Sequence, residues 1–127
     1  AILMIETDLP IMMTCSNSVG IEKGTILKLT TPFTVAATSA DNDVFGGIAA
    51  EEKIANDGKT KISVYRQGIF KMTCGAAGAT VGKNQAISAK NCVVDSTAAD
   101  NDLGYVVGKA LETATNGEFF LVHVGLI

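Results

Sequence analysis

The chain has 127 residues, of which 47% are hydrophobic, and a formal net charge of −3 at pH 7. This length fits one domain with a substantial core. The negative net charge and the absence of any Lys/Arg cluster in the sequence argue against a nucleic-acid partner. No apolar run approaches the roughly 20 residues of a membrane helix, which argues against a membrane partner. Glycine is abundant, with 13 residues, and aromatics are scarce, with five Phe, two Tyr and no Trp. This mixture favours short strands and many turns, so we predict a mainly β protein.

The first 13 residues carry many apolar side chains but little amphipathic order. Pro10 interrupts any strand or helix that crosses it. These side chains would be awkward in water on a monomer, and two interpretations stay open. The segment 1–13 is either an edge strand packed on the body or an extended arm that docks on a neighbouring subunit or partner by strand pairing.

The stretch Val44–Thr73 indicates a β-meander. Residues Thr60–Arg66 alternate, with Ile62 and Val64 on one face, which is typical of a strand with one buried side. The turn before it contains Gly58. By the same reasoning the whole chain predicts strands over Thr25–Leu29, Phe33–Ala37, Phe45–Ala50, Thr60–Arg66, Ile69–Met72, Gln85–Ser88, Cys92–Val94, Tyr105–Leu111 and Phe119–Val124. Turn signals at this spacing favour a small β-barrel or sandwich.

The chain also repeats itself at a spacing of 59 residues. Met13-Thr14-Cys15 recurs as Met72-Thr73-Cys74, the Asp-Asn-Asp segment 38–44 recurs at 97–103, and Gly58 recurs as Gly117. At the same offset Ile62 and Val64 meet Leu121 and His123. We therefore predict a single β domain, 1–127, built from two pseudo-repeated halves, 14–71 and 73–127, that follow the arm 1–13.

No residue pattern indicates catalysis. His123 is the only histidine, and no nucleophile elbow accompanies it, so a structural role is favoured over a Ser-His-Asp triad. The two Asp-Asn-Asp triplets are better explained as Asx-type turns than as calcium loops, which need six or more oxygens. We therefore expect no catalytic residue, no metal and no cofactor.

Two further motifs have simple structural explanations. The segment 75–83 resembles a phosphate-binding loop but lacks the G-K-[ST] ending, because Asn84 follows Lys83, and it is interpreted as a flexible loop between the halves. The three cysteines, Cys15, Cys74 and Cys92, have no C-x-x-C spacing. They are expected to be small buried thiols of a chain made in a reducing cytoplasm.

Two segments carry a resemblance to a known family. Gly47-Ile48-Ala49 is followed, after a charged turn, by Lys61–Lys71, a strand ending in Tyr, a basic residue, a polar residue and Gly. Val107–Leu111, then Gly117 and a closing apolar strand, complete the pattern. From about Gly20 onward the chain resembles the head-decoration (capsid cement) proteins of tailed bacteriophages, including the lambda type.

The resemblance implies a β-tulip-like homotrimer on the capsid exterior of the virion, made in the host cytoplasm, which binds the major capsid protein and stabilises the coat lattice without enzymatic activity. Subunit contacts are expected at Tyr65, Arg66 and Phe70. Capsid contacts are expected from the arm residues Ile2, Leu3, Met4, Ile5, Leu9, Pro10, Ile11 and Met12. The main alternative is a ligand-binding β-module, for example for glycans. Such sites usually present exposed aromatic side chains, of which this chain has few. A hydrolase that uses His123 is a third hypothesis.

Overall fold

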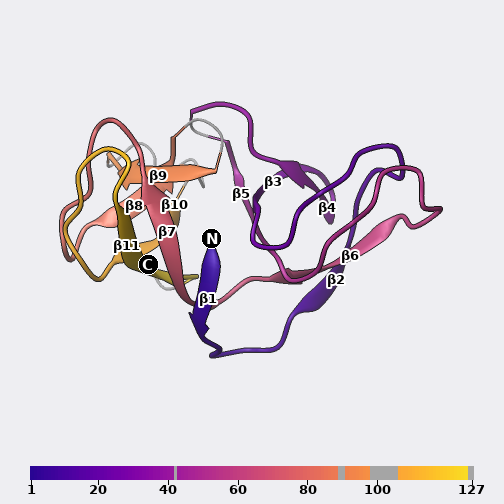
Figure 1. The fold of residues 1–127 in the computed structure, drawn as a ribbon, viewed down its shortest axis with the longest axis horizontal. Coiled ribbons are helices and arrows are strands. Elements are labelled where there is room, and N and C mark those ends of the chain that lie inside the picture. Colours follow the sequence, from indigo (N-terminus) through magenta and orange to yellow (C-terminus); the bar gives the residue numbers. More distant parts are fainter. Residues whose placement is uncertain (42, 89–90, 98–105, 126–127) are drawn as a thin grey trace.

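The computed structural model describes residues 1–41, 43–88, 91–97 and 106–125. These residues form eleven strands and no helix (Figure 1). The strands are β1 (Ile2–Ile5), β2 (Ile11–Thr14), β3 (Ile26–Thr31), β4 (Thr34–Ala37), β5 (Phe45–Ala49), β6 (Lys61–Tyr65), β7 (Gly68–Cys74), β8 (Asn84–Ile87), β9 (Cys92–Asp95), β10 (Val106–Ala110) and β11 (Phe119–Val124).

The first barrel is a closed sheet of five strands in the order β2-β4-β3-β5-β6. Its interior is filled by side chains that alternate along the strands, as the period of two requires. On β6, for example, Ile62 and Val64 are fully buried, whereas Lys61 points to solvent. The buried set consists of Met13, Cys15, Ile21, Leu27, Val35, Ala49, Ile62 and Val64.

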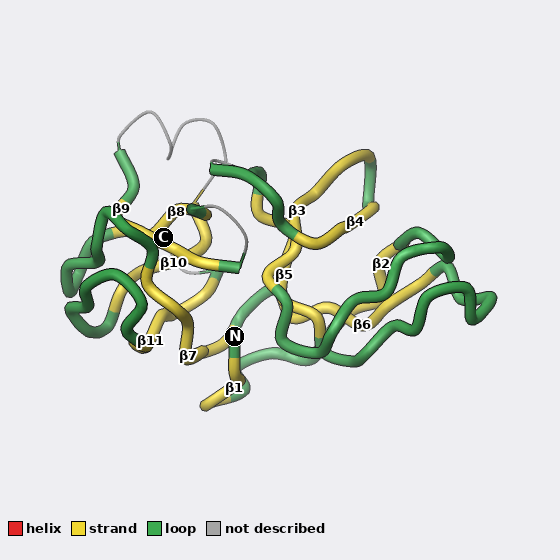
Figure 2. Tube along the Cα trace, turned by 45° about the horizontal axis from the view of Figure 1, so that its top comes forward, coloured by secondary structure: helices red, strands yellow, loops and turns green. Residues whose placement is uncertain are grey.

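The second barrel has the order β7-β11-β10-β8-β9, and the pairing of β7 with β9 closes it. Strand β1 lies outside this ring and pairs with β7, so the complete sheet has six strands. The two barrels lie side by side along the long axis of the molecule (Figures 1 and 2). The prediction of a mainly β, barrel-type fold is confirmed, but each half closes a barrel of its own, whereas the sequence predicted one small barrel or sandwich formed by both halves.

The two barrels repeat the same connectivity down to single hydrogen bonds. In each barrel the third and fourth strands flank the second in the ring, and the first and third strands run parallel to each other. Three backbone hydrogen bonds of the first barrel run from the N–H of Cys15 to Thr60 (2.9 Å), of Ile21 to Lys53 (2.8 Å) and of Gly24 to Ala49 (2.8 Å). Their equivalents in the second barrel run from Cys74 to Glu118 (2.8 Å), from Ala79 to Ala114 (2.9 Å) and from Gly82 to Ala110 (2.8 Å). The chain is therefore an internal tandem repeat in three dimensions.

The repeat spacing is not constant, which corrects one part of the sequence alignment. Met13 lies opposite Ile62 in the first barrel, and Met72 lies opposite Phe120 in the second. The equivalents of Ile62 and Val64 are therefore Phe120 and Val122, not Leu121 and His123 as predicted. A slip of one residue turns a strand's side chains to the other face, so His123 points outward.

A shared core joins the barrels. Ile26 and Ile48 of the first barrel belong to the same buried cluster as Phe70 and Phe120 of the second. In addition, Asn91 at the turn before β9 reaches across: its Oδ1 accepts the Ile26 N–H (2.8 Å) and its own N–H donates to Thr38 Oγ1 (2.9 Å). The second barrel starts with β7 at Gly68, so the segment 75–83 lies inside this barrel, between β7 and β8, and not between the halves as predicted.

Candidate functional site

The N-terminal segment is built into the molecule. Strand β1 pairs antiparallel with β7, with Ile2 opposite Lys71 and Leu3 opposite Phe70. The Ala1 nitrogen donates to the carbonyl of Gly24 (2.6 Å). Of the two interpretations left open for residues 1–13, the structure shows the edge strand packed on its own body, and β2 is a strand of the first barrel.

The segment nevertheless keeps most of its apolar side chains in solvent. Leu9 is 74% exposed and Ile2 is 61% exposed. Leu3 alone among the β1 side chains packs against the shared core. The exposed apolar residues of the segment are Ile2, Met4, Ile5, Leu9, Ile11 and Met12, while Pro10 is half-buried.

The three residues predicted at a subunit interface lie where the two barrels meet. Phe70 is 1% exposed and makes an edge-to-face contact with Tyr65, with 5.8 Å between the ring centroids. Arg66 donates to the carbonyl of Gly46 (2.8 Å) and stacks over the Phe45 ring. A buried Phe70 cannot touch a second subunit, so its role is to join the barrels within one chain.

Tyr65 also fastens the linker that follows β1. Its hydroxyl donates to the Glu6 carboxylate at 3.1 Å. Burial, together with this nearby carboxylate, raises the pKa of Tyr65, so the phenol keeps its proton and remains a donor. This contact holds residue 6 beside the junction of the barrels.

The exposed side of the β1-β7-β11 sheet carries both apolar and polar side chains. Because Phe70 and Phe120 point into the barrel, the alternate residues of β7 and β11 point outward. They are the apolar Ile69, Phe119 and Leu121 and the polar Lys71, Thr73 and His123. On β1, Ile5 lies opposite Ile69, and Ile2 lies opposite Lys71, whose other neighbour is Leu121. We define the outer apolar face as Ile2, Met4, Ile5, Leu9, Met12, Ile69, Phe119 and Leu121.

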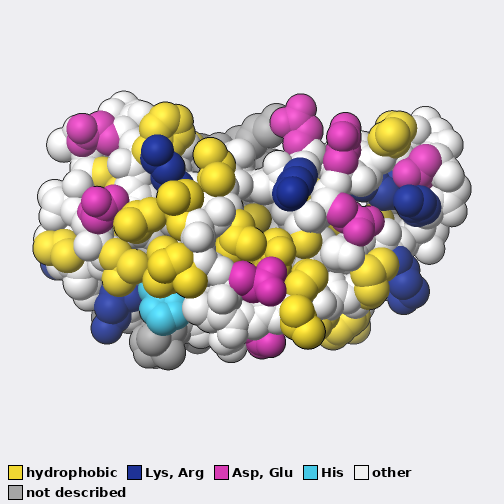
Figure 3. Space-filling model, turned by 60° about the horizontal axis from the view of Figure 1, so that its bottom comes forward, with side chains coloured by type: hydrophobic (Ala, Val, Ile, Leu, Met, Phe, Trp, Pro, Cys, Tyr) yellow, Lys and Arg dark blue, Asp and Glu magenta, His cyan; other side chains and the backbone are white. Residues whose placement is uncertain are grey.

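Figure 3 shows hydrophobic side chains as a band that runs across both barrels on this side of the molecule. Phe119 is 64% exposed, and the Lys71 ammonium lies over its ring at 5.4 Å from the centroid. A scattered exposed Ile or Leu is ordinary, but a continuous apolar surface marks an interaction site. The described residues thus present a surface suited to adhesion.

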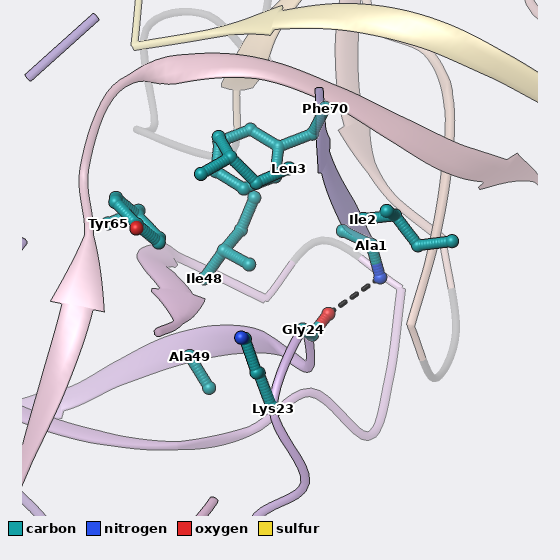
Figure 4. A pocket seen from close by; sticks show the side chains of 9 residues that line it. All are labelled: Ala1, Ile2, Leu3, Lys23, Gly24, Ile48, Ala49, Tyr65 and Phe70. Carbon is teal, nitrogen blue, oxygen red and sulfur yellow. Dashed lines mark hydrogen bonds between the residues drawn. The ribbon is translucent and has the colours of Figure 1, made fainter. Parts of the chain in front are cut away.

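A cavity of about 430 Å³ lies beneath β1 at the junction of the barrels (Figure 4). Its walls are mostly apolar or backbone, from Leu3, Ile48, Tyr65 and Phe70, and Lys23 supplies a charged side chain. The lining residues carry the Ala1 amino group, the Lys23 amine and the Tyr65 hydroxyl, but no carboxylate or histidine that could act on them as a base. The cavity is therefore a space left where β1 closes over two barrels, and its shape depends on β1 staying in place.

The described residues contain no cluster of three or more His, Cys, Asp or Glu that could hold a metal ion. His123 lies on the outer side of β11, between Ile69 of β7 and Lys109 of β10 in the sheet register. No carboxylate stands beside it in that register, so the arrangement does not form a catalytic triad.

The three cysteines are free thiols, and Cys15 and Cys74 occupy equivalent buried positions in the two barrels. Burial raises the pKa of both thiols, which keeps them protonated and unreactive. Within the described part of the chain, no helix is long and apolar enough to cross a membrane.

The first Asp-Asn-Asp triplet behaves as a turn. Asp43 Oδ2 accepts the N–H groups of Ser39 (2.8 Å) and Ala40 (3.1 Å), so its carboxylate closes the loop onto the residues before it. These bonds run back along the chain, whereas the predicted Asx-type turn bonds the N–H two residues ahead. The second triplet, at 100–102, lies outside the described residues.

The sequence did not reveal the part of the outer apolar face that β7 and β11 supply. A signal was present: Phe119, Leu121 and His123 alternate with Phe120, Val122 and Val124, so both faces of one strand are largely apolar. A strand of this kind is buried on both sides or has one side available to a partner.

The fold is that of a tandem pair of five-stranded barrels, and we compared the chain with protein families and solved structures. No protein-family model matches the chain, and no curated protein matches its sequence. The chain is similar to a solved structure, the head fiber gp8.5 N base of bacteriophage phi29. The TM-score is 0.57 and the identity is 14%, over 91% of this chain and 92% of that one. At this identity the likeness concerns the fold.

Proposed function

We propose that this protein is a non-enzymatic structural component of a tailed-phage head that binds the outer surface of the coat. The observation that carries the proposal is the likeness of the whole double-barrel fold to the base of a phage head fiber. The resemblance of the sequence to head-decoration proteins leads independently to the same place in the virion. A shared fold alone does not define a function, so the exposed surface must also be suited to binding a coat protein.

The outer apolar face fits adhesion. A monomer in water gains nothing by exposing Ile5, Leu9 and Phe119, at 55%, 74% and 64% of their surfaces. Covering such side chains against a coat protein stabilises the complex by about 25 cal/mol per Å² of apolar surface. Many equivalent sites on one shell add avidity when the protein binds as an oligomer.

The finer proposal is a homotrimer that cements neighbouring coat subunits, with the exposed arm residues Ile2, Met4, Ile5, Leu9, Ile11 and Met12 in contact with the major capsid protein. Since β1 belongs to the sheet, these residues would bind as part of a preformed surface. Preorganisation lowers the entropy cost of binding compared with a free arm.

The test is co-sedimentation of the purified protein with heads of the phage that encodes it, prepared without the protein. We expect saturable binding, and heads that release their DNA at a higher temperature once decorated. The solution mass, measured alone and on dissociated complexes, tests the trimer. Heads that bind none of the protein at micromolar concentration would refute the proposal.

A further inference from the structure

The internal repeat reveals a strand edge that is used in one barrel and left open in the other. In the second barrel, β7 pairs with β11 on one side. On its other side it pairs with β9 at Thr73 and Cys74 and with β1 at Ile69, Phe70 and Lys71. In the first barrel, β2 pairs with β6 on one side, but on the other side it meets only β4, at Thr14.

The backbone groups of β2 that have no neighbouring strand can be located from the hydrogen bonds around them. Thr14 N–H donates to the Phe33 carbonyl on the β4 side (3.0 Å), whereas Cys15 N–H donates to Thr60 on the β6 side (2.9 Å). Backbone groups alternate sides along a strand, so the N–H and C=O of Met12 point to the β4 side. In the part of the chain that the structure describes, no strand lies beside Met12 there.

Met12 corresponds to Lys71 at the repeat spacing of 59, and Lys71 is where β1 pairs, opposite Ile2. The edge at Ile11 and Met12 is thus the counterpart of the edge that β1 covers. Both side chains are exposed, at 42% and 49%, and as successive strand residues they point to opposite faces, with Met12 on the outer apolar face. Pro10 has no N–H, so the ladder available to a new strand begins at Met12.

We propose that this edge, at Ile11 and Met12, receives a short extended apolar segment of the coat protein, which pairs with β2 as β1 pairs with β7. The inference rests on the proposed function and deepens it. The occupant's chemistry follows from β1, whose sequence Ile-Leu-Met-Ile places Leu3 over Phe70 and exposes the alternate residues. Strand addition of this kind obtains affinity from the main chain and specificity from alternate side chains.

The β1 strand of a second copy is a weaker candidate than a coat segment for the strand that pairs with this edge of β2. Only the linker 6–10 separates β1 from β2, and β1 already pairs with its own β7. Moving it to a neighbour's β2 would open one edge in order to cover another, with no net gain in paired strands. A coat segment adds pairing without removing any.

The first experiment is hydrogen exchange of the full chain, free and bound to heads, read at the Met12 amide. We expect at least tenfold slower exchange at Met12 on the heads, and protection in the free chain also when the peptide Ala-Ile-Leu-Met-Ile-Glu is added in excess. If the protein binds heads and the Met12 amide stays unprotected, the edge proposal is overturned while the proposed function stands. If heads do not bind, the proposed function fails, and the peptide measurement alone decides whether the edge accepts a strand.

The second experiment compares Met12→Pro with the control Met12→Ala. Both remove the side chain, but only proline removes the N–H, and Ile11 already has the extended backbone that a following proline requires. We expect Met12→Pro to bind heads about tenfold more weakly than Met12→Ala, with both folded by circular dichroism. Equal affinities overturn the proposal. Protection of Met12 in the free wild type that grows with protein concentration would assign the edge to a second copy and overturn the coat segment as its occupant.

Discussion

The docking of β1 can be tested by one substitution that has a matched control in the same chain. Gly24 and Gly82 are equivalent turn residues with φ of +87° and +85°. A Cβ at Gly24 would collide with the carbonyl oxygen of Ala1, whereas a Cβ at Gly82 meets nothing within 4 Å. Both alanine variants carry the left-handed backbone penalty of about 1 kcal/mol. Only Gly24→Ala must also displace the start of β1.

The additional loss of stability in Gly24→Ala cannot exceed what β1 contributes to the free energy of unfolding. Its pairing with β7 and the partial burial of Leu3 are together worth roughly 2–3 kcal/mol. At roughly 4 °C per kcal/mol for a chain of this size, Gly82→Ala lowers Tm by about 4 °C, and Gly24→Ala lowers it by up to about 12–16 °C. Detachment of β1 limits the loss, since the rest of the second barrel remains closed by the β7–β9 pairing.

The assay is thermal unfolding together with hydrogen exchange of the β1 amides. We expect the amides of Ile2 and Met4 to lose protection in Gly24→Ala and to keep it in Gly82→Ala. Equal protection of β1 and an equal fall in Tm in the two variants would refute the reasoning that Ala1 packs on Gly24.

Three further predictions concern the joint between the barrels and acid stability. Phe70→Ala removes a core side chain that both barrels share, so the free energy of unfolding falls by about 3–5 kcal/mol; a loss below about 1 kcal/mol in denaturant titration would contradict the shared core. Asn91→Ala leaves the Ile26 N–H without its side-chain acceptor, at a cost of about 1–3 kcal/mol, which the same titration measures. Burial opposes the ionisation of Asp95, but hydrogen bonds from Thr80 and the Gln85 amide outweigh it and lower the pKa of Asp95. Its contribution is fully present above the unfolded pKa of about 3.9 and is lost as the pH falls through the lower folded value, so in acid the wild type loses stability faster than Asp95→Asn does. Parallel pH curves would contradict this.

Local pattern was enough to find the strands. The alternation of Ile62 and Val64, and the Gly turn before them, predicted β6 within a residue at each end. The Met-Thr-Cys repeat likewise marked the equivalent ends of β2 and β7. These features depend on neighbours in sequence, which a single chain displays directly.

The candidate site was harder to predict because it depends on which strands become neighbours. Nothing in the residues Ile2–Ile5 states that their partner is β7, about 65 positions away. The same holds for Phe70, whose exposed or buried state depends on the meeting of two barrels. The one-residue change of repeat spacing near Phe120 was also hidden, since insertions in turns leave the strand pattern intact.

The central claim is that the outer apolar face holds the protein on a phage head. The most direct measurement is the affinity for heads of Ile5→Lys, set against Ile54→Lys as the control. Ile54 is also well exposed, at 64%, but lies in the loop between β5 and β6, outside the face. We predict that Ile5→Lys loses at least tenfold in head binding while Ile54→Lys binds as the wild type does. Equal binding by both variants would contradict the account.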